Sequence, residues 1–291
     1  MKTPNFFIIG APKCGTTSLA AWLAAHPAVY MSPNKEPAYF AADLKVVRPG
    51  LQEYQALFSP AGDAHLAVGE ASTCYLFSRV AVGDILAQVT QPRFIVCLRN
   101  PIEMARSLHQ QELFGLNEDV RTFEDAWGLQ ETRRAGQRIP RTCREPWLLG
   151  YKARCLLGEQ VGRLLQQIDR KSVLFLLLED MCADPRTQHR RVLQFLDLPD
   201  DGRVLFPVLN RAKETRSRLV KEGVIYLSEL RLSLGITRRF GIRPRLEKWN
   251  TRHVPRIAIR EETKRDLRNC FAEDIQNLGA LLNRDLTHWL A

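Results

Sequence analysis

Lys13 lies in a glycine- and threonine-rich loop between a short apolar run and a helical pattern. The stretch FFIIGAPKCGTTSLAAWLAAHP, residues 6–27, predicts a strand, a loop, and a helix that begins near Thr17. The amides of Gly15, Thr16 and Thr17 would be donors at the N-terminus of this helix, whose dipole favours anions. Together with the charge of Lys13, these donors predict a site for a phosphate or sulfate group. The alternative is a plain strand-to-helix turn with Lys13 in solvent.

A second positive side chain follows another apolar run. In RFIVCLRNPIEMARSLHQQEL, residues 93–113, Arg99 comes just after a predicted strand, and Ser107 lies two turns into the helix that follows. The carboxyl ends of parallel strands share one edge of a sheet, where ligands bind. Arg99 is therefore expected at the same edge as Lys13, where a guanidinium can clamp a second phosphate in bidentate fashion.

The elements that must position these residues are short and alternate along the chain. Five apolar runs predict strands, at 6–9, 28–31, 67–68, 93–98 and 173–178. Helical patterns lie between them, at 17–25, 80–89, 102–114 and 151–168. Strands that alternate with helices predict an α/β fold of three layers, with a central, mainly parallel five-stranded sheet flanked by helices.

Two further segments have a different character. Residues 114–146 are more polar and predict a loop or insertion over the sheet, a usual place for substrate contacts. Residues 184–199 predict a helix with Pro185 in its first turn.

The C-terminal third is rich in basic residues. From 211 to 260 they dominate, which is typical either of a solvated loop or of a lid that meets an anionic ligand. Residues 260–282 predict an amphipathic helix with acidic residues in its first turn. We expect one domain over 1–291, with a core at 5–200 and a basic lid and helical part at 201–291.

Composition limits the class of protein. The 291 residues carry a formal net charge of +10, which favours acidic partners without choosing among them. The seven cysteines are scattered and contain no CxxC pair, so neither a zinc site nor a disulfide framework is indicated. The chain has no signal-peptide pattern and no apolar run of about 20 residues. We expect a soluble cytoplasmic protein that binds no metal.

The motifs resemble those of a known family. GAPKCGTTSL resembles the 5′-phosphosulfate loop of sulfotransferases, and LRNPIEMARS resembles their 3′-phosphate-binding element. SPNKEPAYF and VGEASTCYLF are similar to stretches in heparan-sulfate-type carbohydrate sulfotransferases, and LLLEDM resembles their YEDL segment. The resemblance covers about residues 5–185 and is closest to the soluble bacterial members, whose fold is P-loop-like.

The resemblance implies the donor 3′-phosphoadenosine 5′-phosphosulfate (PAPS), with adenosine 3′,5′-bisphosphate (PAP) as the product. It places the 5′-phosphosulfate against the loop residues Lys13, Cys14, Gly15, Thr16 and Thr17. It places the 3′-phosphate against Arg99 and Ser107, and the basic C-terminal region adds Arg216, with Arg218, as residues that close over it. The sequence departs from the family at Arg106, where an aromatic residue is common, and at Thr73, where proline is common.

Sulfuryl transfer requires neutralisation of the leaving phosphate and removal of a proton from the acceptor. Lys13 suits the first task, and the resemblance assigns the second to Glu70, in AVGEAS. His109 is the competing base, but it lies two residues after Ser107, about 200° around the same helix.

His26 and Lys35 are further candidate bases, and Glu36 is the neighbour of Lys35. His26 precedes Pro27 at a predicted helix end and is expected to cap that helix. Lys35 and Glu36, in NKEPAYF, are expected to contact the sulfate or the acceptor, with an exposed turn as the alternative for Lys35.

The predicted activity is sulfuryl transfer from PAPS to a hydroxyl or amine of a small molecule or glycan. A P-loop kinase is the nearest alternative, but it needs a lysine after the last glycine of the loop and an acidic magnesium ligand at a strand end. Here Thr16 follows Gly15, and Arg99 stands at the second strand end. A non-enzymatic nucleic-acid-binding protein is compatible with the charge, but no helix-turn-helix, zinc or aromatic-platform signature accompanies it.

Overall fold

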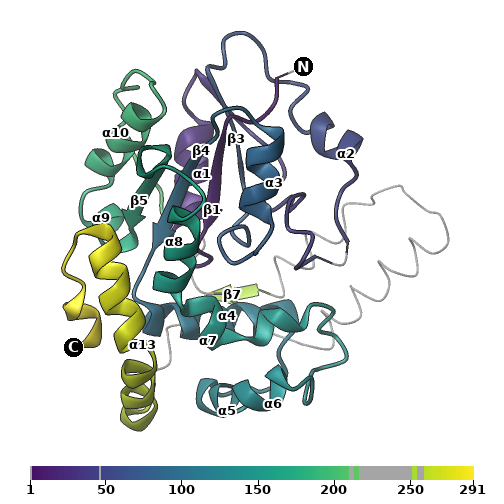
Figure 1. Ribbon diagram of the computed structural model, residues 1–291, viewed down its shortest axis with the longest axis vertical. Helices are drawn as coiled ribbons and strands as arrows, with labels where there is room; N and C mark the ends of the chain where they lie inside the picture. The colour runs from purple at the N-terminus through teal and green to yellow at the C-terminus, as the bar shows by residue number, and fades with distance from the viewer. Residues whose placement is uncertain (1, 46, 210–212, 216–250, 254–258) are drawn as a thin grey trace, which may run out of the picture. The chain divides into compact units, whose positions relative to one another are not determined.

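The computed structural model describes residues 2–45, 47–209, 213–215, 251–253 and 259–291 (Figure 1). These residues fall into two compact units. The first comprises the described residues of 2–105, 152–209 and 261–291, and the second comprises those of 106–151 and 210–260. The expectation of a single domain over 1–291 stays a prediction.

The first unit contains the five-stranded parallel sheet, which confirms the predicted fold class. Its strands are β1 (Phe6–Gly10), β2 (Val29–Met31), β3 (Ala67–Ala71), β4 (Arg93–Leu98) and β5 (Val173–Leu177). They run in the order β2-β3-β1-β4-β5, and every pair is parallel. β1 is therefore central, with β3 and β4 on its two sides.

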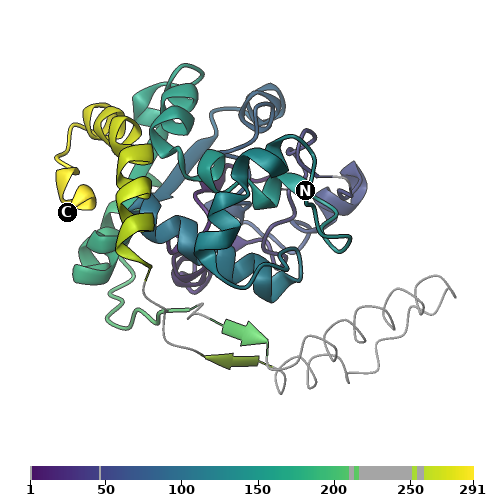
Figure 2. The same ribbon diagram turned by 90° about the horizontal axis from the view of Figure 1, so that it is seen from below.

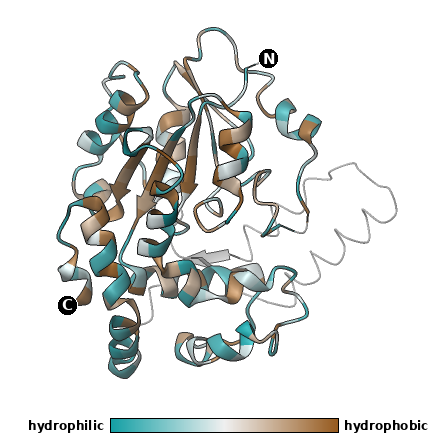
Figure 3. Cartoon of the chain, in the orientation of Figure 1, coloured by the Kyte–Doolittle hydropathy of each residue, from teal (hydrophilic) through white to brown (hydrophobic). Residues whose placement is uncertain are grey.

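The core of the first unit follows from the apolar runs. All five residues of β1 are buried, and the strands are hydrophobic along most of their length (Figure 3). Phe7 stacks on Phe94 of the neighbouring strand, with ring centroids 6.0 Å apart. Helices cover strands that are buried on both faces, so these runs do not alternate between apolar and polar residues. Helix α1 contacts β1, β2 and β3, and helix α10 contacts β5.

The helices mostly lie where the sequence predicts them. The first unit contains α1 (Thr16–Ala24), α2 (Leu51–Ala56), α3 (Ala81–Gln88), α8 (Leu157–Leu165), α9 (Leu178–Ala183), α10 (Pro185–Phe195) and α13 (Glu261–Leu282). It also contains the 3₁₀ turns η2 (Arg170–Ser172) and η3 (Thr287–Leu290). Helix α4 (Pro101–Gly115) begins in this unit, and α13 packs on α8.

One predicted helix is wrong in detail. The pattern over 151–168 forms two helices, α7 (Tyr151–Cys155) and α8, with a break at Leu156. The carboxylate of Asp274, on α13, accepts hydrogen bonds from the amides of Gly158 and Glu159 at 2.8 and 2.9 Å. These bonds satisfy donors at a helix N-terminus, so a second helix begins here.

In the second unit, the stretch 114–146, which the sequence predicts to be a loop or insertion, contains helices, so a plain loop is wrong. This stretch contains α5 (Phe123–Gly128), α6 (Gln130–Arg134) and the 3₁₀ turn η1 (Pro146–Leu149). The Thr122 side chain caps α5 by accepting a hydrogen bond from the amide of Asp125. The same unit contains the antiparallel pair β6 (Lys213–Thr215) and β7 (Thr251–His253), which is clearest in Figure 2.

Candidate active site

The loop after β1 is tightly folded around two glycines. Gly10 has φ +157°, and a Cβ there would lie 2.8 Å from the Cβ of Leu76. Gly15 has φ +89° and is the N-cap of α1, where a Cβ would lie 2.9 Å from Leu178. A side chain at either position would be strained, so the loop requires glycine at both. Helix α1 consequently begins at Thr16 with no side-chain cap from the residue before it.

Lys13 and Cys14 have different surroundings in this loop. Lys13 is half-buried and has a left-handed backbone, with φ +66°. Cys14 is fully buried, and its thiol contacts the carbonyl oxygen of Pro12 at 3.4 Å. Burial raises the pKa of this thiol to about 12, although the charges of Arg99 and Lys13 oppose the rise. Cys14 can therefore offer a ligand only its backbone.

Arg99 is fixed at the end of the neighbouring strand. It follows the last residue of β4, and its guanidinium is about nine-tenths buried. Nη1 donates to the carbonyl oxygen of Lys13 at 3.2 Å, and Nη2 donates to Glu103 at 3.3 Å. The prediction that Arg99 and Lys13 share one edge of the sheet is thus confirmed by a direct hydrogen bond.

Glu70 lies within β3, not after it as the sequence suggested. The strand continues through Gly69 and Glu70 because both pair with β1, and Glu70 stands opposite Phe7. Its side chain is fully buried, and neither carboxylate oxygen has a hydrogen-bond partner among the described residues. Burying a carboxylate without a hydrogen-bond partner costs folding free energy. Such groups are often found at functional sites, so Glu70 is a candidate for a catalytic residue.

The environment of Glu70 shifts its protonation. Burial raises the pKa of the carboxyl from 4.5 to about 8. The hydroxyls of Tyr75 and Tyr54 lie near the carboxyl without meeting hydrogen-bond geometry and partly offset this rise, and the charge of Glu36 adds to it. Tyr54 and Tyr75 were missed in the sequence. Tyr75 is only five residues from Glu70, but Tyr54 comes from α2, and no spacing pattern indicated it.

Lys35 and Glu36 lie in an exposed loop that is bonded to the segment after β3. The Glu36 carboxylate accepts a hydrogen bond from the amide of Thr73 at 2.7 Å and further bonds from its hydroxyl. It also forms an ion pair with Lys35. Thr73, which stands where the family commonly has proline, supplies an N–H that proline lacks. The Glu36 carboxylate is thus already bonded to Thr73 and Lys35. Its negative charge also raises the pKa of Glu70.

The other candidate bases are enclosed in packed surroundings. In the second unit, His109 is 2% exposed, and Nε2 lies 2.8 Å from the carbonyl oxygen of Val120. Burial lowers its pKa. In the first unit, the His26 ring bonds the amide of Ala28 and the carbonyl of Pro199. It therefore makes no side-chain cap for α1, whose C-cap is Ala25.

Among the other residues predicted to bind PAPS, three lie on helices and two lie outside the described residues. Ser107 lies on α4 and is half-buried. Thr16 and Thr17 form the first turn of α1. Arg216 and Arg218 lie outside the described residues.

The second unit contains a buried charge cluster that the sequence did not predict. The Glu118 carboxylate accepts two hydrogen bonds from Arg133 at 2.6 Å and one from the Tyr151 hydroxyl at 2.8 Å. Both partners of the ion pair are almost fully buried. Its residues are spread over a polar stretch that carries no such signal.

Two features of the described residues concern metal binding and membrane spanning. Among the described residues, no group of three His, Cys, Asp or Glu side chains is arranged to hold a metal ion. Within the same part of the chain, no helix combines the length and the apolar character that a membrane span requires.

The chain belongs to the sulfotransferase domain family, whose sequence profile matches residues 3–214. It is 28% identical over 205 residues to heparan sulfate glucosamine 3-O-sulfotransferase 3A1 of Mus musculus, covering 68% of this chain and 46% of that protein. It is 24% identical over 212 residues to protein-tyrosine sulfotransferase A of Caenorhabditis elegans, covering 70% and 52%. The chain spans about half the length of the curated relatives it matches.

A solved structure has the same fold. The sulfotransferase from Alicyclobacillus acidocaldarius superposes with a TM-score of 0.74 at 24% identity, and the match covers 100% of both chains. The resemblance inferred from the loop motifs is therefore confirmed at the level of family and fold. The kinase and nucleic-acid-binding alternatives find no support in these relatives.

Proposed function

We propose that the protein is a sulfotransferase that moves a sulfuryl group from PAPS to a hydroxyl or amine of a carbohydrate or small molecule. The observation that supports this most is the placement of Lys13, Glu70 and Arg99 on three neighbouring parallel strands, β1, β3 and β4, or just past their ends. Two cations and a base are the groups that the reaction needs, since charge builds on the leaving phosphate while the acceptor loses a proton.

The loop around Lys13 fits a phosphosulfate. Gly15 starts α1 without a side-chain cap, and Lys13 lies beside this helix N-terminus, so a dipole and a point charge converge. When bound, PAPS supplies an activated sulfuryl group on a phosphate leaving group. We assign its 5′-phosphosulfate to Lys13 and the backbone of Cys14–Thr17. We assign its 3′-phosphate to Arg99, Ser107 and Arg216.

Glu70 is proposed as the general base. Its pKa of about 8 lies near physiological pH, where a general base is most effective. Its oxygens have no partner within the described residues and can accept the acceptor's proton. We assign Lys35 and Glu36 to the acceptor side, with Glu36 acting in part through Glu70. No metal is assigned a role.

The acceptor is proposed to be a hydroxyl or an amine, and the names of two relatives favour the hydroxyl. Relatives of this chain are named for a glucosamine 3-O position and for tyrosine, and both are hydroxyl acceptors. A sugar or small-molecule hydroxyl, with neither nucleic acid nor a membrane as partner, is the proposed class. A cytoplasmic location in a bacterium stays a prediction.

Calorimetric titration with PAP and with 5′-AMP tests the donor assignment without knowledge of the acceptor. Charge-assisted hydrogen bonds to the 3′-phosphate are worth roughly 1.5–3 kcal/mol each. PAP is therefore expected to bind at least about tenfold more tightly than AMP. Equal affinities would contradict the assignment.

A further inference from the structure

Trp289, near the C-terminus, joins the ends of two core strands. Its side chain is 2% exposed. Its carbonyl oxygen accepts a hydrogen bond from Nδ2 of Asn100 at 3.0 Å, and its indole N–H donates to Glu179 at 3.0 Å. Asn100 follows β4 by two residues, and Glu179 follows β5 by two residues. One residue is thus bonded to the carboxyl ends of two strands that pair with each other.

Further polar bonds hold the C-terminal segment, residues 284–291, which lies beside α9 (Figure 1). Arg284 makes a two-pronged ion pair with Asp180 at 2.5 and 2.8 Å. His288 lies 3.0 Å from Glu179, and Arg268 donates to the carbonyl oxygen of Ala291 at 2.9 Å.

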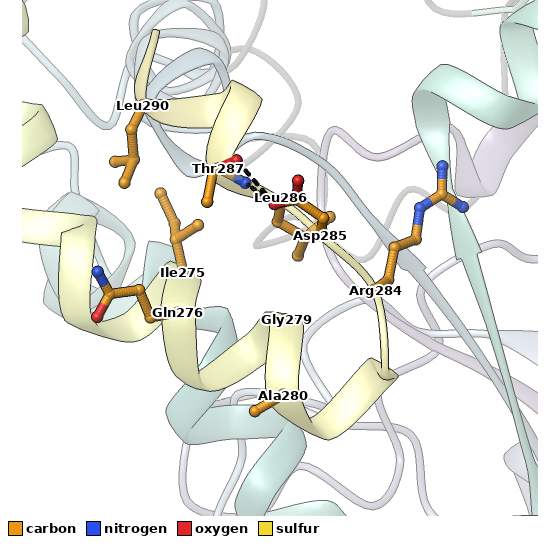
Figure 4. A pocket seen from close by; sticks show the side chains of 9 residues that line it. All are labelled: Ile275, Gln276, Gly279, Ala280, Arg284, Asp285, Leu286, Thr287 and Leu290. Atoms are coloured by element: carbon orange, nitrogen blue, oxygen red, sulfur yellow. Dashed lines mark hydrogen bonds between the residues drawn. The ribbon is translucent and has the colours of Figure 1, made fainter.

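The packing of this segment against α13 is incomplete. A hollow of about 210 Å³ lies between them, lined by Ile275 and Gly279 on one side and by Leu286 and Leu290 on the other (Figure 4). The polar bonds to α9 and to Asn100 therefore contribute directly to fixing the position of the segment.

Asn100 connects this segment to the turn between β4 and α4, which contains Arg99. Its side-chain oxygen accepts from the amide of Ile102 at 2.9 Å, and its carbonyl oxygen accepts from the amide of Met104 at 2.9 Å. The side chain thus caps α4 on one side and donates to the main-chain carbonyl of Trp289 on the other, while the indole of Trp289 is anchored on Glu179. The residue immediately before it is Arg99, whose guanidinium reaches the carbonyl of Lys13.

We propose that Trp289 is a positioning residue, which holds Asn100 and thereby orients Arg99 toward the 3′-phosphate of the donor. The C-terminal segment would then determine how strongly the protein distinguishes a nucleotide with a 3′-phosphate from one without. This inference rests on the proposed function, since it assigns Arg99 to that phosphate. Trp289 itself lies outside the sequence motifs, whereas its partners Asn100 and Glu179 lie within them.

The test compares PAP and AMP affinities by calorimetry in wild type and two variants. Trp289→Phe keeps an aromatic ring and the main-chain carbonyl that accepts from Asn100, but it removes the indole bond to Glu179 that anchors this carbonyl. Asn100→Ser keeps a residue able to cap α4 but is too short to reach Trp289. The matched control is Thr287→Val, in the same segment, whose hydroxyl bonds only Asp285 among the described residues. Near-UV circular dichroism checks that each variant is folded, and either of the first two carries the test if the other does not fold.

One hydrogen bond is worth about a two- to tenfold change in an equilibrium constant. Both variants are expected to lose about that factor of the PAP-to-AMP preference, with AMP affinity unchanged, and Thr287→Val is expected to retain it. If Trp289 had only a structural role, the variants would bind PAP and AMP with equally reduced affinity, or both affinities would be unchanged. A wild-type preference that both variants keep would overturn this inference alone. Equal wild-type affinities would overturn the donor assignment, and this inference with it.

Discussion

Glu70→Gln offers a test of the proposed catalytic carboxyl that requires no substrate. Glutamine has nearly the same shape, but it does not titrate. The carboxyl has a pKa of about 8 in the folded protein against 4.5 for the free group, so between these values the folded state binds more protons than the unfolded state. The contribution of this group to stability is therefore fully present below pH 4.5 and is lost as the pH rises toward 8.

The size of the loss follows from the two pKa values. Each unit of difference corresponds to about 1.4 kcal/mol, so a gap of about 3.5 units gives roughly 5 kcal/mol. The side chain is fully buried, so solvent screening does not reduce the figure substantially. Relative to wild type, Glu70→Gln is expected to gain stability by roughly this amount between about pH 5 and pH 8, and to gain little more above that.

Urea unfolding of both proteins at a series of pH values, followed by circular dichroism, measures this difference. Glu131→Gln is the control, because the Glu131 side chain is 70% exposed and its removal should leave the wild-type pH profile unchanged. Profiles of wild type and Glu70→Gln that run parallel from about pH 5 to pH 9 would refute the raised pKa. The assignment of Glu70 as a base poised near neutral pH would fail with it.

Three further predictions concern activity and stability. Glu70→Gln is expected to reduce turnover about 10²–10⁴-fold with PAP affinity unchanged, and to reduce it less for a phenol, whose proton leaves more easily. Steady-state kinetics with alkyl and phenolic acceptors would show an equal loss for both if Glu70 were not the base. Lys13→Ala is expected to slow transfer to every acceptor, phenols included, in the same assay, because the charge of Lys13 is proposed to act on the leaving group. Arg133→Met leaves Glu118 buried without its ion-pair partner and is expected to cost roughly 3–5 kcal/mol in urea unfolding, whereas exposed Arg134→Met should cost less than about 1 kcal/mol.

The sequence predicted the sheet because its strands are buried on both faces. Runs such as Phe6–Ile9 have no polar face, so they stand out from helical patterns even when they are short. The parallel arrangement then places Lys13 and Arg99 at one edge, and the structure confirms a bond between them.

The features that the sequence did not predict depend on distant contacts. The helix over 151–168 is broken because Asp274, more than 100 residues away, accepts the amides of Gly158 and Glu159. Glu70 is buried beside Tyr54 because a short helix after β2 brings that ring to the site. Neither the contact of Asp274 with residues 158–159 nor that of Tyr54 with Glu70 is visible in the local sequence of the segment that it affects.

We propose that the loop around Lys13 serves sulfuryl transfer from PAPS. The most direct test is accurate-mass spectrometry of a panel of sugar and phenolic acceptors, incubated either with PAPS and EDTA or with ATP and magnesium. Acceptors are expected to gain a sulfuryl group from PAPS in the presence of EDTA, and Lys13→Ala is expected to abolish this gain. Acceptors that gain a phosphoryl group from ATP and magnesium, and none that gains a sulfuryl group, would contradict it.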